Sequence, residues 1–206
     1  MWFGGRRKAH GVGVVVLAAS LSLALAGCGT GSTVGGPKAA EKVLPPVESM
    51  PAGLKTVAAK PSGRPLMGKS VKKCAYSADS RPSDWCKTAV AEGDASYGSD
   101  AGGKQAYFRV VVYRSESAAK RAFGSWESSI RSSSHKYRVL NGEKFGSESV
   151  TFVGAEKSSQ DTQEVDVREG QFIGTVEIRG IAKPDAVDPT LSTLSKMFVD
   201  RMQKEG

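Results

Sequence analysis

Acidic side chains on predicted strands are the residues of this 206-residue sequence that come nearest to an arrangement for acid–base chemistry. Glu148, Asp166 and Glu177 could supply the paired carboxylates that glycoside cleavage requires. The alternating pattern of these strands instead favours acidic side chains that face solvent, on a sheet with one buried and one exposed face. His135 lies in a serine-rich segment without an obvious partner, and neither a G-x-S-x-G motif nor calcium-loop spacing of aspartates occurs. We therefore expect no catalytic residues, no metal site and no cofactor.

Residues 63–70 match the G-x-x-x-x-G-K-[ST] pattern of phosphate-binding loops. Such a loop binds phosphates because a hydrophobic strand delivers it and a helix follows it. Residues 56–62 do not form a hydrophobic strand pattern, and residues 70–74 do not begin an amphipathic helix. We expect no nucleotide binding at this pattern.

The N-terminal segment has the layout of an export signal. Arg6, Arg7 and Lys8 form a positive region, and an apolar stretch follows over residues 12–26. This stretch suits a signal peptide and is shorter than the about 20 residues of a membrane-spanning helix. The general secretory route fits better than twin-arginine export, because no apolar residue follows Arg7 directly.

The stretch ends in Leu25-Ala26-Gly27-Cys28, which resembles the lipobox of bacterial lipoproteins. The resemblance implies that residues 1–27 are cleaved off and that Cys28 carries a diacylglyceryl thioether. Acyl chains would then hold the protein on the extracytoplasmic face of the cell membrane. An ordinary secretory signal with a chance cysteine, or an uncleaved anchor, is the alternative.

Cys74 and Cys86 are the two cysteines outside the lipobox. In an oxidising compartment they would form a disulfide, which at this loop length stabilises a fold by about 3 kcal/mol. A redox pair is the alternative, but C-x-x-C spacing is absent.

Residues 28–66 are dominated by Gly, Ala, Pro, Ser and Lys and contain no aromatic residue. Such a composition buries too little apolar surface to offset chain entropy, so we expect a disordered tether here. The segment holds five basic and two acidic residues, and residues 67–206 are close to neutral. The net charge of +8 is therefore no indication of nucleic-acid binding.

Residues 67–206 read as a single extracytoplasmic domain. Residues 107–113 are nearly all β-branched or aromatic, which predicts a central strand covered on both faces. Alternation in residues 163–179 predicts a hairpin with a turn at Glu169-Gly170, one buried face and one wet face. The predicted strands are residues 86–97, 104–114, 136–140, 148–154, 163–168 and 171–179.

Two helices complete the domain. Ser115 caps a helix whose apolar residues, including Phe123 and Trp126, recur at three- and four-residue spacing. The final helix opens at Asp188-Pro189, a capping residue with proline in the first turn. Because hairpin connections dominate, the predicted fold class is α+β, with an antiparallel sheet of about five to six strands and two main helices.

The strand and helix order, the cysteine pair and the lipobox together resemble small envelope lipoproteins of actinobacteria. These are similar to the extracellular sensor domains of actinobacterial serine/threonine kinases and to the PsbP-like fold. The resemblance rests on the helix at residues 117–130 with its A-x-x-A-F-x-x-W pattern, on Phe145-Gly146-Ser147-Glu148 before a strand, and on the hairpin at residues 167–172. It implies a ligand-sensing or scaffolding role without catalytic residues.

We therefore expect a membrane-anchored, non-catalytic binding or sensor module for an unidentified envelope ligand or protein partner. Candidate ligand-binding residues are Tyr97, Tyr107, Arg109 and Arg168, although each is also a simple sheet-face residue. A structural or accessory subunit of an envelope complex is one alternative. An envelope hydrolase is the other.

Overall fold

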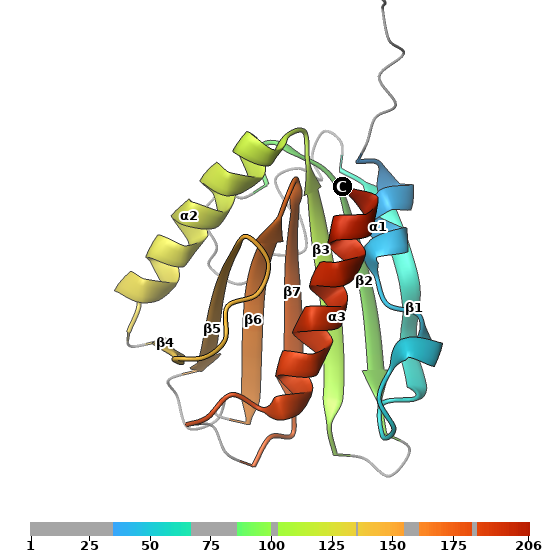
Figure 1. Ribbon diagram of the computed structural model, residues 1–206, viewed down its shortest axis with the longest axis vertical. Coiled ribbons are helices and arrows are strands. Elements are labelled where there is room, and N and C mark those ends of the chain that lie inside the picture. Colours follow the sequence, from blue (N-terminus) through green and yellow to red (C-terminus); the bar gives the residue numbers. More distant parts are fainter. Residues whose placement is uncertain (1–34, 67–85, 100–102, 135, 155–160, 183–184) are drawn as a thin grey trace, which may run out of the picture. The chain divides into compact units, whose positions relative to one another are not determined.

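The computed structural model describes residues 35–66, 86–99, 103–134, 136–154, 161–182 and 185–206. Within them, seven strands form one antiparallel sheet in the order β1-β2-β3-β7-β6-β5-β4 (Figure 1). The α+β class and the antiparallel sheet are confirmed, with one strand more than the predicted five to six. The strands are β1 (Thr56–Pro65), β2 (Ala89–Gly98), β3 (Gln105–Tyr113), β4 (Tyr137–Val139), β5 (Glu148–Gly154), β6 (Thr162–Glu169) and β7 (Phe172–Arg179).

Two long helices begin where the sequence predicts them. In α2 (Glu116–Ser132), the Ser115 side chain accepts a hydrogen bond from the backbone N–H of Ala118 at 3.2 Å. In α3 (Pro189–Glu205), the Asp188 side chain accepts from the backbone N–H of Thr190. Such caps satisfy backbone donors that the first helical turn leaves without intrahelical partners.

Residues 35–66 are not a disordered tether, which corrects the prediction from composition. They form helix α1 (Pro37–Val43), the short 3₁₀ turn η1 (Val47–Ser49) and edge strand β1. Five apolar residues of this segment are almost completely buried in one hydrophobic cluster: Ala40, Val43, Leu44, Met50 and Leu54. These residues are spaced irregularly between prolines and glycines and form no periodic pattern. The composition of the segment therefore led to the wrong prediction of a disordered tether.

Gly63 permits the close contact between α1 and the edge of the sheet. A Cβ at this position would lie 2.0 Å from the carbonyl oxygen of Pro37, so no larger residue fits. Gly63 thus belongs to an edge strand on which a helix packs. The part of the phosphate-loop pattern beyond Leu66 lies outside the described residues.

The central strands separate two hydrophobic clusters. α1 and α3 pack on one face, over Phe108, Val110 and neighbouring residues, and α3 crosses the front of the sheet in Figure 1. α2 packs on the other face, over Val111 and Ile173. Burial of β3 on both faces is therefore confirmed.

The prediction that one face of the β6–β7 hairpin is exposed to solvent is wrong, although the predicted turn at Glu169-Gly170 is correct. Gly170 has a φ of +53°, which glycine adopts readily. Every residue of β7 from Phe172 to Ile178 is buried. Alternation does not reveal that a helix from elsewhere in the chain covers the second face.

Candidate functional site

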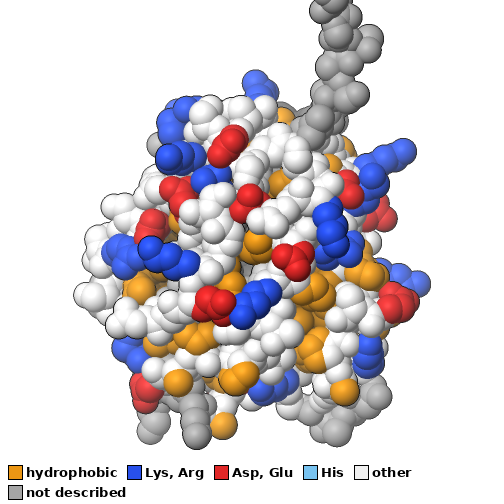
Figure 2. Space-filling model, in the orientation of Figure 1, with side chains coloured by type: hydrophobic (Ala, Val, Ile, Leu, Met, Phe, Trp, Pro, Cys, Tyr) orange, Lys and Arg blue, Asp and Glu red, His pale blue; other side chains and the backbone are white. Residues whose placement is uncertain are grey.

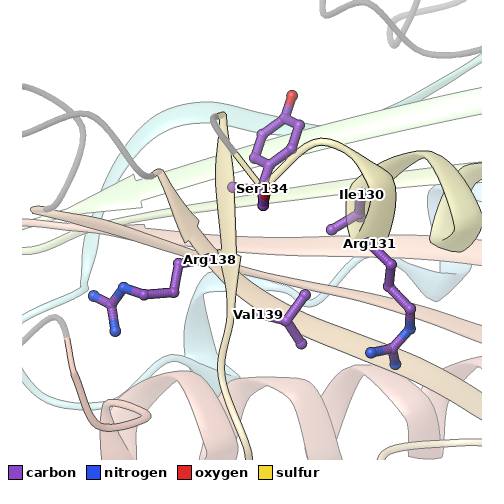
Figure 3. A pocket seen from close by; sticks show the side chains of 6 residues that line it. Ile130, Arg131, Ser134, Arg138 and Val139 are labelled. Carbon is purple, nitrogen blue, oxygen red and sulfur yellow. The ribbon is translucent and has the colours of Figure 1, made fainter.

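The last turn of α2 and strand β4 border a cavity of about 450 Å³ (Figure 3). This volume falls within the range of small-molecule sites. Its lining combines apolar side chains with two arginines and polar groups: Ile130, Arg131, Ser134, Tyr137, Arg138 and Val139.

A tight turn after α2 brings these residues together. The backbone N–H groups of Lys136 and Tyr137 both donate to the carbonyl oxygen of Ser133, at 2.8 and 3.0 Å. The turn directs the chain back beside the helix end, where β4 pairs with β5. As a result Arg131 from the helix and Arg138 from the strand lie on either side of Val139 (Figure 3).

Both arginines have carboxylate partners near the cavity. Arg131 donates from Nε and Nη2 to Oε1 of Glu127, at 3.0 and 2.7 Å. Nη1 of Arg138 lies 2.9 Å from Oδ1 of Asp185, whose side chain is 87% exposed. Exposed ion pairs contribute little to stability, so an anionic ligand can replace either carboxylate at small cost.

The apolar wall behind the arginines is held rigidly. Trp126, Tyr137 and Phe152 contact one another edge to face, with ring centroids 5.2 to 6.3 Å apart. The indole N–H of Trp126 donates to the carboxylate of Asp166, which also accepts from the hydroxyl of Thr175. Because Asp166 is fully buried, this network fixes the indole and the rings packed on it.

A second, smaller cavity of about 140 Å³ adjoins the first. The two share Arg131 and Val139, and the smaller one adds Asn141 and Lys144 from the β4–β5 loop. Together they form what we call the α2–β4 groove, which is apolar in its larger part and is lined by three basic side chains and by the acidic Glu143.

The four predicted ligand-binding residues do not line this groove. Tyr97 is buried on the face covered by α1 and α3, and its hydroxyl donates to the carbonyl oxygen of Pro45. Burial raises the pKa of the Tyr97 hydroxyl, and the charge of nearby Arg201 opposes the shift. Tyr97 therefore fastens the segment before β1 to the sheet.

The other three share the opposite face of the sheet but remain separate from the groove. The Tyr107 hydroxyl donates to Gln105 at 2.7 Å, and the Arg179 guanidinium lies 4.6 Å from the centre of its ring. Arg109 is half-buried and pairs across the strands with Thr175.

Arg168 acts as a structural clamp on this face. It is only 4% exposed, and its guanidinium donates to Glu148 on β5, to Glu116 at the start of α2 and to the carbonyl oxygen of Gly170. It joins two strands, a turn and a helix.

The carboxylates considered for catalysis are engaged in similar contacts. Asp166 and Glu177 are buried, which corrects the expectation of solvent-facing acids. Glu148 bonds to Arg168, Asp166 accepts from Trp126 and Thr175, and Glu177 bonds to Arg179. The contacts of Glu148 and Asp166 link β5, β6 and α2, whereas Glu177 pairs with a residue of its own strand.

Sequence reasoning missed the groove residues. The available signal was weak: Arg131 and Arg138 stand on either side of the serine-rich break that ends α2. A cavity depends on how sharply the chain turns at that break, which composition does not reveal.

Other predicted sites are only partly described. Cys86 is buried at 5% exposure, but Cys28 and Cys74 lie outside the described residues, so the lipid anchor and the Cys74–Cys86 disulfide stay predictions. Among the residues that the structure describes, no group of three His, Cys, Asp or Glu side chains could hold a metal ion. None of the described helices is long and apolar enough to span a bilayer.

Comparisons with known proteins add little to this picture. No protein-family model and no curated protein matches the sequence. Among solved structures, the chain is similar to the extracellular domain of PknH from Mycobacterium tuberculosis, with 12% sequence identity and a TM-score of 0.42. The similarity covers 57% of this chain and 66%, just under two thirds, of that one.

Proposed function

We propose that this protein is a lipid-anchored, extracytoplasmic, non-catalytic binding module whose ligand site is the α2–β4 groove. The ligand class that fits the groove is a small amphiphile that carries an anionic group, a phosphate or a carboxylate, next to an apolar segment.

The observation that carries the binding role is the placement of two arginines from different elements around one apolar cavity. Small-molecule sites are mostly apolar, with a few placed polar groups that orient the ligand. Guanidinium groups suit phosphate and carboxylate because they present several donors in a planar fork. Arg131 and Arg138 offer this chemistry beside Val139 and Tyr137.

The order of the N-terminal sequence supports the anchor and the location. A positive region, an apolar stretch and the lipobox at Cys28 follow one another in the arrangement typical of exported lipoproteins. The contacts of Glu148, Asp166 and Glu177 support a non-catalytic role, since Glu148 and Asp166 tie structural elements together and Glu177 pairs with Arg179 on its own strand.

Octyl phosphate and octanoate are suitable probes, and octyl glucoside is an uncharged control with the same chain. We expect saturable binding of an anionic probe to the wild-type protein by isothermal titration calorimetry. The double variant Arg131→Gln/Arg138→Gln should bind about tenfold more weakly, because charge-assisted hydrogen bonds are lost.

Lys55→Gln/Lys60→Gln is the matched control, with the same change of charge at exposed positions on or beside β1. It should bind like the wild type. Absence of saturable binding of both anionic probes, or equal weakening by the two double variants, would overturn the groove as the ligand site and favour an accessory-subunit role.

A further inference from the structure

We propose that one end of the domain docks on the anionic phospholipid headgroups of the membrane that holds the Cys28 anchor. This end, here called the proximal end, comprises the start of α1, the last turn of α3 and the β6–β7 turn. The inference rests on the lipid anchor of the proposed function and adds an orientation to it.

Chain length is the first argument. Six residues separate Cys28 from Gly35, where the described fold begins. Fully extended, the seven residue steps from Cys28 to Gly35 span at most about 24 Å. A disordered tether over residues 28–66 would have allowed the domain to move far from the bilayer, but the fold takes up most of that segment.

The place where the chain enters the fold is the second argument. A Cβ on Gly35 would lie 3.0 Å from Val112 and 3.2 Å from Gln171, at the ends of β3 and β7. At the other terminus, Gly206 lies beside Phe172, the first residue of β7. The start of α1 and the end of α3 therefore meet at one end of the sheet, as Figure 1 shows.

Exposed basic side chains gather at the proximal end. Two of them, Lys87 and Arg114, belong to it because the backbone N–H of Arg114 donates to Thr88 at 3.2 Å and that of Tyr113 donates to Gln171. Basic side chains project from both flanks of the upper part of the molecule in Figure 2. The proximal basic cluster consists of Lys38, Lys42, Lys87, Arg114 and Lys204, all exposed.

Three acidic side chains of the proximal end have contacts within the chain, whereas Glu41 on α1 is exposed. Glu116 pairs with Arg168 at 3.3 Å, and Glu205 pairs with Lys42 at 3.4 Å. Glu169 accepts from the hydroxyl of Ser147 at 3.0 Å. Lys42 is paired with Glu205, so the excess of positive charge at this end comes from Lys38, Lys87, Arg114 and Lys204, which outnumber Glu41 and Glu169. This excess is what an approaching anionic surface meets.

The surface here is also hollowed. A depression of about 620 Å³ lies between the start of α1 and the end of α3, with Lys38 and Lys42 on its lining beside Glu205. Phosphate headgroups can therefore approach the two ammonium groups.

Docking at this end gives the groove a defined direction. α2 begins at the proximal end and its 17 residues extend for about 25 Å. The α2–β4 groove lies at its far end and would face away from the bilayer. A lipid anchor combined with a basic surface is a two-signal arrangement that holds a protein stably on a membrane.

The test is cosedimentation with vesicles, using the chain from residue 28 to Gly206 with Cys28→Ser, which cannot carry the lipid. We expect binding to vesicles of equal parts phosphatidylglycerol and phosphatidylcholine at low salt, and loss of binding at high salt or on phosphatidylcholine alone. Lys38→Gln/Lys42→Gln/Lys204→Gln should lower the partition coefficient at least about tenfold, since each basic residue near an anionic surface adds to the attraction.

The matched control is Lys55→Gln/Lys60→Gln/Lys136→Gln, which removes the same charge from exposed positions away from the proximal end. Circular dichroism verifies that both variants are folded. Equal weakening by the two triple variants, or equal binding to both vesicle types, would overturn the docking face. The mass of the N-terminal peptide of the membrane-extracted protein tests the lipid on Cys28 separately, so the anchor and the docking face can fail independently.

Discussion

Asp188 contacts two elements with one carboxylate. It caps α3 through the backbone N–H of Thr190 at 2.8 Å, and it accepts from Nζ of Lys104 at 2.7 and 3.0 Å. Burial acts to raise the pKa of this carboxyl, but the hydrogen bonds to Lys104 and Thr190 outweigh it and leave the pKa lowered. The charged form of Asp188 thus stabilises the folded state.

Asp188→Asn is expected to make stability less dependent on pH. The carboxyl of Asp188 has a lower pKa in the folded state than in the unfolded chain, so its contribution is present above about pH 4 and is lost as the pH falls through the folded pKa. The asparagine can still cap α3 but cannot pair with Lys104. Urea unfolding should therefore show a deficit at neutral pH that shrinks under acid conditions.

Asp200→Asn, at an exposed position on the same helix, serves as the control for this prediction. Its difference from the wild type should stay small throughout the titration. A deficit for Asp188→Asn that is the same at acid and neutral pH would mean that the charge of Asp188 contributes nothing to stability.

At the scale of elements, residues 35–66 contribute a helix to the core and an edge strand to the sheet. Pro61 fits into β1 because an edge strand can lack one ladder hydrogen bond. Arg201 of α3 donates to the carbonyl oxygen of Val43 at 2.8 Å, and Tyr97 of β2 donates to Pro45. These contacts make the segment part of the domain.

Leu44→Ala should destabilise the protein by about 2–5 kcal/mol, because it leaves a cavity beneath α1 where the leucine is only 1% exposed. Val57→Ala is the control within the same segment, since Val57 is 37% exposed. It should change the free energy of unfolding by about 0.5 kcal/mol or less. Equal and small effects in chemical denaturation would restore the tether interpretation.

At the scale of the whole molecule, the same contacts decide where the domain begins. A chain of residues 67–206 would lack α1 and β1, which would expose β2 as an edge and uncover Tyr97 and the core around it. We expect this chain to aggregate or to melt without cooperativity.

A chain of residues 35–206 should unfold in one cooperative transition, because its two hydrophobic clusters share the central strands. Circular dichroism melting compares the two chains directly. A cooperative transition of the 67–206 chain at the melting temperature of the longer one would show that the N-terminal segment is dispensable for folding.

Much of the fold could be predicted from the sequence, because local patterns determine it. The continuous run of β-branched and aromatic residues at 107–113, the cap at Ser115 and the Asp188-Pro189 start of α3 each depend on near neighbours in the chain. All three were confirmed. The export signal and the lipobox at Cys28 are likewise sequence patterns, and they stay predictions.

Contacts between distant segments could not be predicted in this way. Asp166 and Glu177 looked solvent-facing because strand alternation does not show that Asp166 lies against Trp126 of α2 or that Glu177 is buried. Leu44 looked like part of a tether because its partners lie on α3 and the sheet, far along the chain. The groove between Arg131 and Arg138 exists only because a turn after α2 places a helix end beside an edge strand. Burial and cavities follow from packing across the chain, and only the tertiary structure decides them.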